Sequence, residues 1–358
     1  MDASEPGPVL AVGGLVGRTA ELATIQRIMA RGRLTTITGL PGVGKTAVAF
    51  AAAAAVSAGF ADGVWLVALD LLRDEDSLPH AIANALKLPD LPDGRQWEAL
   101  VDELWGRRLL LVLDTCEHLA AACARLAMRL LPCAGVRIMA TSREPLRVPG
   151  GLTVTIRPLP LGLAEQMFGV RAGEASPGFE ITAENRDAVT AICRRLDRLP
   201  LGIELAARQL PACTVRQLES RLQGDYWFLQ NTAAATARHE SLKAAIGWSY
   251  ELCTPAEQLA WARLSVFPGS FQLPDAEQVC ADHQLPREAV ATAVSALAAR
   301  SVLAMDLRAG RQARFRLPAT LRAYGADMLG QLGDERWQRR YRAWRGVQIR
   351  DQTGGGAE

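Results

Sequence analysis

The residues with the clearest chemical meaning lie in one glycine-rich stretch that ends in a lysine and a threonine. Gly39-Leu-Pro-Gly-Val-Gly-Lys45-Thr46 has the G-x4-G-K-[ST] spacing of a P-loop. Glycines let backbone N–H groups curl around phosphate oxygens, and the helix that follows adds the partial positive charge of its N-terminus. Lys45 can reach the β- and γ-phosphates of a nucleotide as a catalytic cation. The predicted phosphate-binding residues are Gly39, Pro41, Gly42, Val43, Gly44, Lys45, Thr46 and Ala47.

A carboxylate at the end of an apolar run supplies a second part of the same chemistry. The run Leu109-Leu-Leu-Val-Leu ends in Asp114. Because the carboxyl ends of parallel strands meet at the edge where a P-loop lies, Asp114 is expected beside Thr46. The Thr46 hydroxyl and the Asp114 carboxylate are then predicted to hold Mg²⁺, directly or through water, and Asp114 is a catalytic candidate.

Two further charged residues could act on the terminal phosphate. Glu117 lies three residues past Asp114, whereas many P-loop ATPases place a water-activating Glu directly after this Asp, where Thr115 stands here. Glu117 either activates water or is a charge favoured at a helix N-terminus. Arg143 follows the strand-like run that begins at Val136. It either senses the γ-phosphate, which a guanidinium matches well, or is a solvated arginine after a strand.

Short apolar runs must position these residues. Each run is nearly continuous and without polar alternation, which is typical of parallel strands buried on both faces. Helical stretches lie between them, so the sequence predicts an α/β doubly wound parallel sheet of the P-loop NTPase type. The predicted strands are 34–38, 64–69, 109–114, 136–140 and 153–156.

After residue 160 the predicted strands give way to helices. A region that is mostly helical ends in a predicted hairpin, 302–307 and 313–317, and helices followed by such a wing suggest a winged-helix domain. The predicted organisation is a flexible tail (1–14), a nucleotide-binding domain (15–160), a helical domain (161–238), a winged-helix domain (239–332), and a C-terminal helix and tail (333–358).

The bulk composition excludes several other classes of protein. Hydrophobic residues make up 49% of the chain, and the net charge of +2 gives no overall field for nucleic acid or a membrane. Seven cysteines without a CxxC pair favour buried thiols over a metal site or a disulfide framework. The chain begins without the basic segment of a signal peptide, and its apolar runs are too short to span a membrane. We therefore expect a cytoplasmic protein with no membrane partner.

Taken together, several sequence blocks resemble the STAND-class P-loop ATPases, in the NB-ARC-like branch found in bacterial LuxR-like and SARP-like transcriptional regulators. The blocks occur in one order, which is far more specific than any single block. They are Leu15–Arg18, Gly39–Thr46, Leu109–Leu119, Ala140–Glu144, Leu196–Ala207, Trp248–Tyr250 and Leu264–Gly269.

This resemblance implies a switch that is locked with ADP, opens when ATP replaces it, and is reset by slow Mg²⁺-dependent hydrolysis. It also implies that adenine contacts Val16, Gly17 and Arg18, and packs on Pro200. The segment that holds such proteins closed carries His-Asp or Leu-Glu. Here its place is taken by Leu317-Pro318-Ala319. This departure predicts a weaker hold on ADP.

Three functions remain open at this stage. The first is an ATP/ADP-driven signalling switch in transcriptional regulation, and the second is a stand-alone ATPase with real turnover. The third is DNA binding through the winged helix, whose predicted wing carries Arg308, Arg311, Arg314 and Arg316.

The C-terminal segment carries one more pattern. Trp337, Tyr341 and Trp344 recur at helical spacing. We expect them to form an exposed apolar face that awaits a protein partner or a second copy of the chain.

Overall fold

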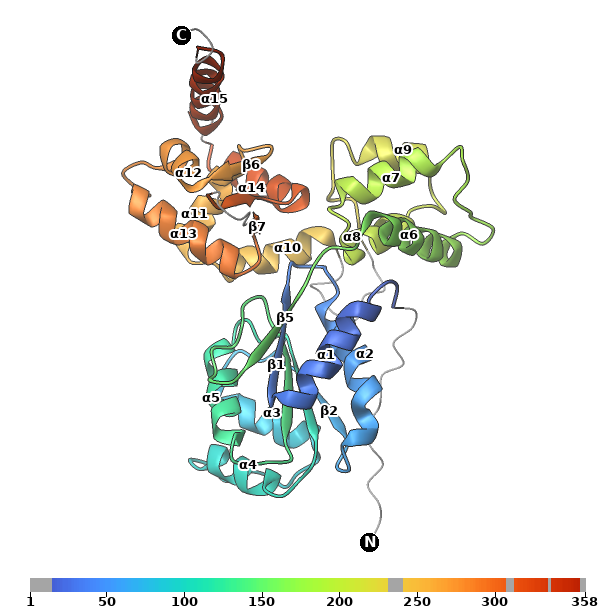
Figure 1. The fold of residues 1–358 in the computed structure, drawn as a ribbon, viewed down its shortest axis with the longest axis vertical. Coiled ribbons are helices and arrows are strands. Elements are labelled where there is room, and N and C mark those ends of the chain that lie inside the picture. The colour runs from blue at the N-terminus through green and yellow to red at the C-terminus, as the bar shows by residue number, and fades with distance from the viewer. Residues whose placement is uncertain (1–14, 231–240, 307–311, 334–335, 355–358) are drawn as a thin grey trace. The chain divides into compact units, whose positions relative to one another are not determined.

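The computed structural model describes residues 15–230, 241–306, 312–333 and 336–354, and within 347–354 only the backbone. The predicted tail at 1–14 lies outside the described residues. The chain divides into two compact units, Met1–Arg157 and Pro158–Glu358, which are described separately below. Figure 1 shows their elements by residue number.

The first unit is built on a sheet of five parallel strands, as the apolar runs predict. They are β1 (Leu34–Gly39), β2 (Val64–Ala68), β3 (Leu110–Asp114), β4 (Arg137–Thr141) and β5 (Leu152–Ile156). Their order is β2-β3-β4-β1-β5, and every pair is parallel. Strands β1 and β3 are buried along their whole length, whereas the edge strand β5 alternates between buried and exposed residues. The expectation of continuous burial is therefore wrong for β5 and for the other edge strand, β2, because an edge strand is open to solvent on one side.

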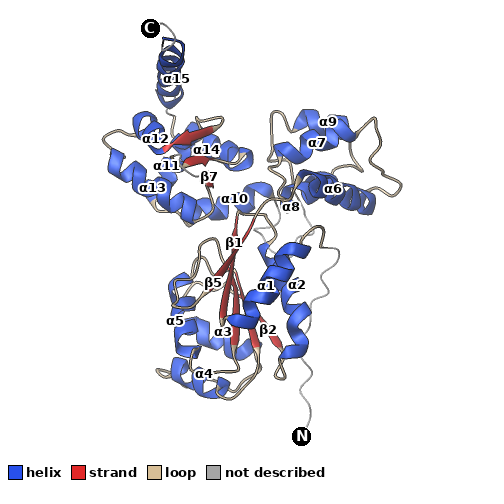
Figure 2. Ribbon diagram, viewed as in Figure 1, coloured by secondary structure: helices blue, strands red, loops and turns tan. Residues whose placement is uncertain are grey.

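Helices lie on both sides of this sheet, so the predicted doubly wound α/β fold is confirmed (Figure 2). They are α1 (Thr19–Arg31), α2 (Lys45–Val56), α3 (Leu78–Ala85), α4 (Gln96–Leu104) and α5 (Ala120–Leu130), with short 3-10 turns at Ser57–Gly59 and Glu75–Ser77. The apolar faces of α3, α4 and α5 join the sheet in one core, in which Ile82, Leu104 and Leu126 are fully buried. This packing fixes the carboxyl ends of β1, β3 and β4, where the candidate site lies.

The second unit begins with four helices. They are α6 (Leu161–Ala175), α7 (Arg186–Arg195), α8 (Pro200–Ala207) and α9 (Val215–Arg221). Pro200 is the first residue of α8, a position that suits proline because its missing N–H would have no helical partner. Among the described residues of the chain, no helix combines the length and apolar character that a membrane span requires.

The rest of the second unit has the order of elements expected of a winged helix. After α10 (Leu242–Glu251) come α11 (Pro255–Leu264), β6 (Ser270–Gln272), α12 (Leu273–Cys280), α13 (Arg287–Ala299), β7 (Ala304–Asp306), β8 (Arg314–Arg316) and α14 (Ala319–Gln331). The strands form an antiparallel sheet in the order β6-β8-β7. The predicted hairpin is therefore present. Strand β6 was not predicted, because its partner β8 lies more than forty residues further along the chain and no hairpin marks the pairing.

The last helix, α15 (Arg336–Gly354), corrects the prediction of an exposed aromatic face. Trp337 is only 1% exposed and packs with Ala262 and Leu329. The rings of Tyr341 and Trp344 lie 5.2 and 5.6 Å from the ring of Phe267, centre to centre. The stripe is thus packed against the winged-helix elements of its own chain.

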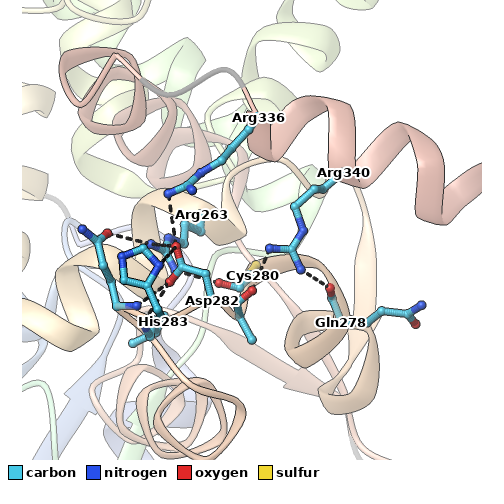
Figure 3. Close-up of polar contacts among 10 residues, drawn as sticks. Arg263, Gln278, Cys280, Asp282, His283, Arg336 and Arg340 are labelled. Atoms are coloured by element: carbon cyan, nitrogen blue, oxygen red, sulfur yellow. Dashed lines mark hydrogen bonds and ion pairs between the residues drawn. The ribbon is translucent and has the colours of Figure 1, made fainter.

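Arginine contacts complete this docking (Figure 3). Arg336 binds Asp282, and Arg340 donates to the backbone carbonyls of Gln278 and Ala281. The buried Arg263 pairs with the same Asp282 at 2.9 Å and lies over the Trp337 ring at 3.9 Å. Burial alone would raise the pKa of the Asp282 carboxyl. The hydrogen bonds and charge of Arg263, together with the backbone N–H groups of Leu285 and Gln284, outweigh burial and hold this pKa below its ordinary value.

Candidate functional site

The glycine-rich loop is shaped by three residues with positive φ. Gly39, Gly42 and Gly44 have φ values of 148°, 71° and 90°. A Cβ at Gly39 would lie 2.5 Å from the carbonyl oxygen of Ile156, the residue that pairs with Gly39 in β5. Only glycine fits there, so the sequence pattern is required both by the backbone turn and by the close approach of a neighbouring strand.

The loop leads directly into α2, whose first turn can bind an anion. Its N-cap, Gly44, provides no side-chain cap, and the first turn contains no acidic residue. The first N–H groups of a helix have no intrahelical acceptor, so they are available to phosphate oxygens. The Lys45 ammonium lies over the same loop and donates to the carbonyls of Gly39 and Leu40 at 3.0 and 3.2 Å.

Asp114 lies at the end of β3, where the structure brings it to the threonine of the loop. The Thr46 hydroxyl donates to Asp114 Oδ1 at 2.7 Å. Asp114 is 4% exposed. The two predicted magnesium ligands therefore lie within hydrogen-bonding distance of each other, although they are far apart in the sequence.

A third residue, Thr141 at the end of β4, also holds this carboxylate. Its hydroxyl donates to Asp114 Oδ1 at 2.5 Å and accepts the Thr115 N–H at 2.8 Å. Thr141 is not among the site residues predicted from the sequence. Its signal was present, because a hydroxyl at the carboxyl end of a buried parallel strand lies at the same sheet edge as Asp114.

Thr115 follows Asp114 in a strained conformation. Its φ is 68°, which is unusual for a β-branched residue. Such backbone strain costs on the order of 1–3 kcal/mol and is often found at functional sites. The turn directs the chain from β3 toward Glu117. His118 Nε2 then lies 2.9 and 3.0 Å from the carbonyls of Leu69 and Leu72, so the ring holds the segment that follows β2.

Glu117 and Arg143 form a buried ion pair beside these residues. Arg143 Nε donates to Glu117 Oε1 at 3.0 Å, and the two side chains are 9% and 8% exposed. Burial alone would raise the pKa of the Glu117 carboxyl, but the charges of Arg143 and Lys45 outweigh burial and hold this pKa below its ordinary value. Arg143 is therefore buried, and the alternative of a solvated arginine after the strand is wrong. Glu117 is ionised at neutral pH and feels the charge of the P-loop lysine.

Two buried oxygen atoms at this edge have no hydrogen-bond partner. They are Glu117 Oε2 and the hydroxyl of Ser142, which lies between Thr141 and Arg143. Buried polar groups without a partner are uncommon in proteins, and a bound molecule or ion is one usual reason for them. The donor set fits a nucleotide with Mg²⁺: backbone N–H groups and Lys45 for phosphate, and hydroxyl and carboxylate oxygens for the metal.

The segment before α1 also reaches the loop. The guanidinium of Arg18, which is 3% exposed, donates to the carbonyls of Val43 and Arg157 at 3.1 and 2.8 Å. Val16 and Gly17 precede it, and Gly17 has a φ of 68°. These three predicted adenine contacts lie in the first unit. Pro200, the fourth, lies in the second unit at the start of α8.

Comparison with known proteins identifies relatives of the chain. A family model described as a winged helix-turn-helix domain matches residues 256–330. The "Putative HTH-type transcriptional regulator Rv0890c" of Mycobacterium tuberculosis is 35% identical over 321 residues, which cover 89% of this chain but only 36% of the regulator. The "Uncharacterized protein Rv0894" of the same organism is 34% identical over 323 residues, which cover 89% of this chain and 82% of that protein.

Solved structures share the fold at low sequence identity. The Walker-type ATPase PABY2304 of Pyrococcus abyssi matches with a TM-score of 0.59 at 11% identity, over 87% of this chain and 96% of that one. The ORC2 protein of Aeropyrum pernix, in ADPNP–ADP complexes, matches with a TM-score of 0.50 at 13% identity, over 92% and 99%. The fold that the chain shares with a Walker-type ATPase is joined to a winged helix-turn-helix domain, and the chain belongs to the family of the mycobacterial proteins.

Proposed function

We propose that the chain is an ATP/ADP-binding switch with slow Mg²⁺-dependent hydrolysis that acts in transcriptional regulation. The observation that carries the proposal is the meeting of Lys45, Thr46, Asp114, Glu117 and Arg143 at one sheet edge. A Walker-type ATPase and a protein in ADPNP–ADP complexes share the fold, which supports the choice of adenine nucleotides. The name of the regulator among the relatives supports the transcriptional output.

Each residue has a distinct task in this proposal. The P-loop residues from Gly39 to Ala47 and the Lys45 ammonium bind the phosphates. Mg²⁺, when bound, neutralises charge on the phosphates, and Thr46 and Asp114 hold it. Val16, Gly17 and Arg18 contribute to the nucleotide site from the segment before α1. Arg143 senses the γ-phosphate from its place beside Glu117.

The structure of the Glu117 pair favours a switch over a stand-alone ATPase. A general base must accept a proton from the attacking water, and a carboxylate with a lowered pKa is a poor proton acceptor. The pKa of Glu117 is lowered, and one of its oxygens is occupied by Arg143. Oε2 remains without a hydrogen bond and can orient water. Hydrolysis is therefore possible but slow.

Two measurements test this proposal. Nucleotide extracted from the purified protein should be ADP or ATP, and the steady-state turnover should be well below about 1 s⁻¹, the lower end of ordinary enzyme rates. Sustained turnover well above that rate would favour the stand-alone ATPase. A protein that carries no nucleotide and binds neither ATP nor ADP would refute the switch.

DNA binding by the winged helix is the second candidate. The family match to a winged helix-turn-helix domain favours it. The exposed residues of α13, the helix at the recognition position, include Arg287, Glu288, Thr292 and Ser295 and carry no excess of positive charge. In the wing, Arg314 donates to Ser270, and Arg308 and Arg311 lie outside the described residues.

A salt titration with duplex DNA decides between these possibilities. Affinity that falls steeply with salt would support DNA binding, because each neutralised phosphate releases counterions. Replacing Arg314 with Ala should then reduce the salt dependence. An absence of binding at low salt would exclude this candidate for the chain.

A further inference from the structure

One carboxylate in the second unit bonds the turn between α7 and α8 to the winged-helix elements. Asp197, in the turn between α7 and α8, accepts the backbone N–H of Ala319 at 3.0 Å and that of Thr320 at 2.9 Å. It also accepts the Thr320 hydroxyl at 2.9 Å, and Arg316 lies 3.7 Å away. Asp197 is 7% exposed and Thr320 is 1% exposed, so water competes little for these bonds.

These bonds replace a helix cap that the local sequence does not provide. The N-cap residue of α14 is Pro318, which makes no side-chain cap. The N–H groups of Ala319 and Thr320 belong to the first turn and have no acceptor within the helix. Asp197 supplies the acceptor from more than a hundred residues away, and its negative charge is also favoured at the positive end of the helix dipole. The start of α14 therefore depends on the α7–α8 turn.

The α7–α8 turn is held in a strained form. Asp197 and Arg198 have φ values of 53° and 59°, two successive non-glycine residues in the left-handed region. This conformation is unfavourable for residues other than glycine, so the turn is retained only because surrounding contacts fix it. The three hydrogen bonds to Asp197 are such contacts. A turn of this kind can relax to another conformation when they are lost.

The same turn is hydrogen-bonded to the segment that connects the two units. The Leu159 N–H donates to the Arg198 carbonyl at 3.1 Å. Two residues before Leu159, the Arg157 carbonyl accepts from Arg18, whose guanidinium also binds the P-loop carbonyl of Val43. A continuous path of covalent and hydrogen bonds therefore runs from the P-loop through Arg18 and residues 157–159 to the α7–α8 turn and the start of α14.

We propose that Asp197 is a regulatory clasp, which is closed on α14 when ADP is bound and opens when ADP leaves. A loop movement at Val43 is transmitted through Arg18 and the 157–159 segment to Arg198, and it changes the strained turn that aims the Asp197 carboxylate. The coupling to nucleotide rests on the proposed function, whereas the clasp itself rests only on contacts in the second unit. Because coupling is reciprocal, opening the clasp weakens the hold on ADP.

The test uses the full chain and four variants. Asp197→Asn removes the charge and one acceptor oxygen at nearly constant shape. Thr320→Val removes only the hydroxyl, and Thr320→Ser restores it. Asp187→Asn is the matched control, because Asp187 is an exposed aspartate in the first turn of α7. Two quantities are measured: hydrogen–deuterium exchange of the amides at 319 and 320, and the release rate of fluorescently labelled ADP.

Asp197→Asn should raise exchange at these amides at least about tenfold, as expected when a charge-assisted hydrogen bond is weakened. It should also speed ADP release by about the same factor. Thr320→Val should act in the same direction, while Thr320→Ser and Asp187→Asn should stay close to the unmodified chain. ADP should slow exchange at 319 and 320 in the unmodified chain.

Two results would overturn the proposal. Unchanged exchange in Asp197→Asn would show that the clasp does not hold α14. Faster exchange with unchanged ADP release would show that Asp197 is only a remote helix cap. A chain that binds no ADP would refute the proposed function, and exchange without nucleotide would still decide whether the clasp exists. If Asp197→Asn fails to fold, Thr320→Val and Thr320→Ser supply the same comparison.

Discussion

Breaking the Glu117–Arg143 pair offers the sharpest test of the site. Both side chains are less than a tenth exposed, and Arg143 Nε lies 3.0 Å from Glu117 Oε1. Removing one partner of a buried pair leaves an uncompensated charge, which typically costs about 3–5 kcal/mol. In Arg143→Gln the charge of Lys45 still stabilises the Glu117 carboxylate, so the loss of unfolding free energy should be about 3 kcal/mol. In Glu117→Gln the loss should be similar, because the Arg143 guanidinium loses its carboxylate.

The double variant Glu117→Gln, Arg143→Gln should be more stable than the sum of the two losses predicts. Its two neutral amides leave no unpaired charge, so we expect a coupling energy of about 1.5–3 kcal/mol. The free energy of unfolding is measured from hydrogen exchange of the β3 and β4 amides, because these report the first unit alone. If the loss of unfolding free energy in the double variant equals the sum of the two single losses to within about 0.5 kcal/mol, the reasoning is refuted.

The same cycle tests the proposed nucleotide chemistry. Glu117→Gln releases the Arg143 guanidinium from a competing carboxylate, so ATP should bind more tightly relative to ADP, while hydrolysis should fall. Arg143→Gln should abolish this preference and bind ADP almost normally. The ratio of ATP and ADP affinities is obtained by titration calorimetry for each variant. An unchanged ratio in both variants would remove Arg143 from the role of γ-phosphate sensor.

Four further outcomes follow. Lys45→Ala should abolish tight ATP and ADP binding, and equal affinities by calorimetry would refute the P-loop assignment. Asp114→Asn should keep the fold, because the amide oxygen can still accept from Thr46, but should remove Mg²⁺ dependence from binding and hydrolysis; a wild-type rate would contradict this. Trp337→Ala should cost about 3–5 kcal/mol in thermal unfolding of the second unit, as for other buried aromatic residues, and a change below about 1 kcal/mol would show that α15 is not docked. Because the pKa of Glu117 is lowered by folding, its stabilisation should be complete above about pH 4.3 and be lost as pH falls through the folded pKa; Glu117→Gln should remove that part of the acid sensitivity in denaturant titrations.

The strands of the first unit could be predicted because their runs of apolar residues indicate burial on both faces. The run that ends in Asp114 is apolar on both faces, and the structure buries every residue of β3. In β5 the sequence Leu152-Thr-Val-Thr-Ile156 itself alternates between apolar and polar residues, which indicates one open face but not the strand with which it pairs. Strand β6 pairs with β8, which lies more than forty residues further along the chain, so no local pattern marks it. Local pattern therefore predicts a strand, while its place in the sheet comes from contacts between distant segments.

The C-terminal helix shows a similar limit for surfaces. The spacing of Trp337, Tyr341 and Trp344 correctly indicates one apolar face on a helix, but spacing says nothing about what covers it. Phe267 and Arg263 cover this face. They precede the helix by about seventy residues, and nothing in their local sequence indicates that they pack on it. An arginine also proves a poor sign of exposure here, because Arg263 is 1% exposed and uses its charge on Asp282 while its planar face lies on Trp337.

The strand order explains why a threonine completes the predicted metal site. In the order β2-β3-β4-β1-β5, strand β4 lies between β1, which leads into the P-loop, and β3, which ends in Asp114. The last residue of β4 therefore reaches the same Asp114 oxygen that accepts from Thr46. Thr141 fills that place with a hydroxyl that donates to Asp114 and accepts from Thr115. It fixes both the orientation of the carboxylate and the strained turn that leads to Glu117. A valine at position 141 would have nearly the same shape but would leave the Thr115 N–H without this acceptor, so the orientation of the Asp114 carboxylate and the turn at Thr115 depend on the same hydroxyl.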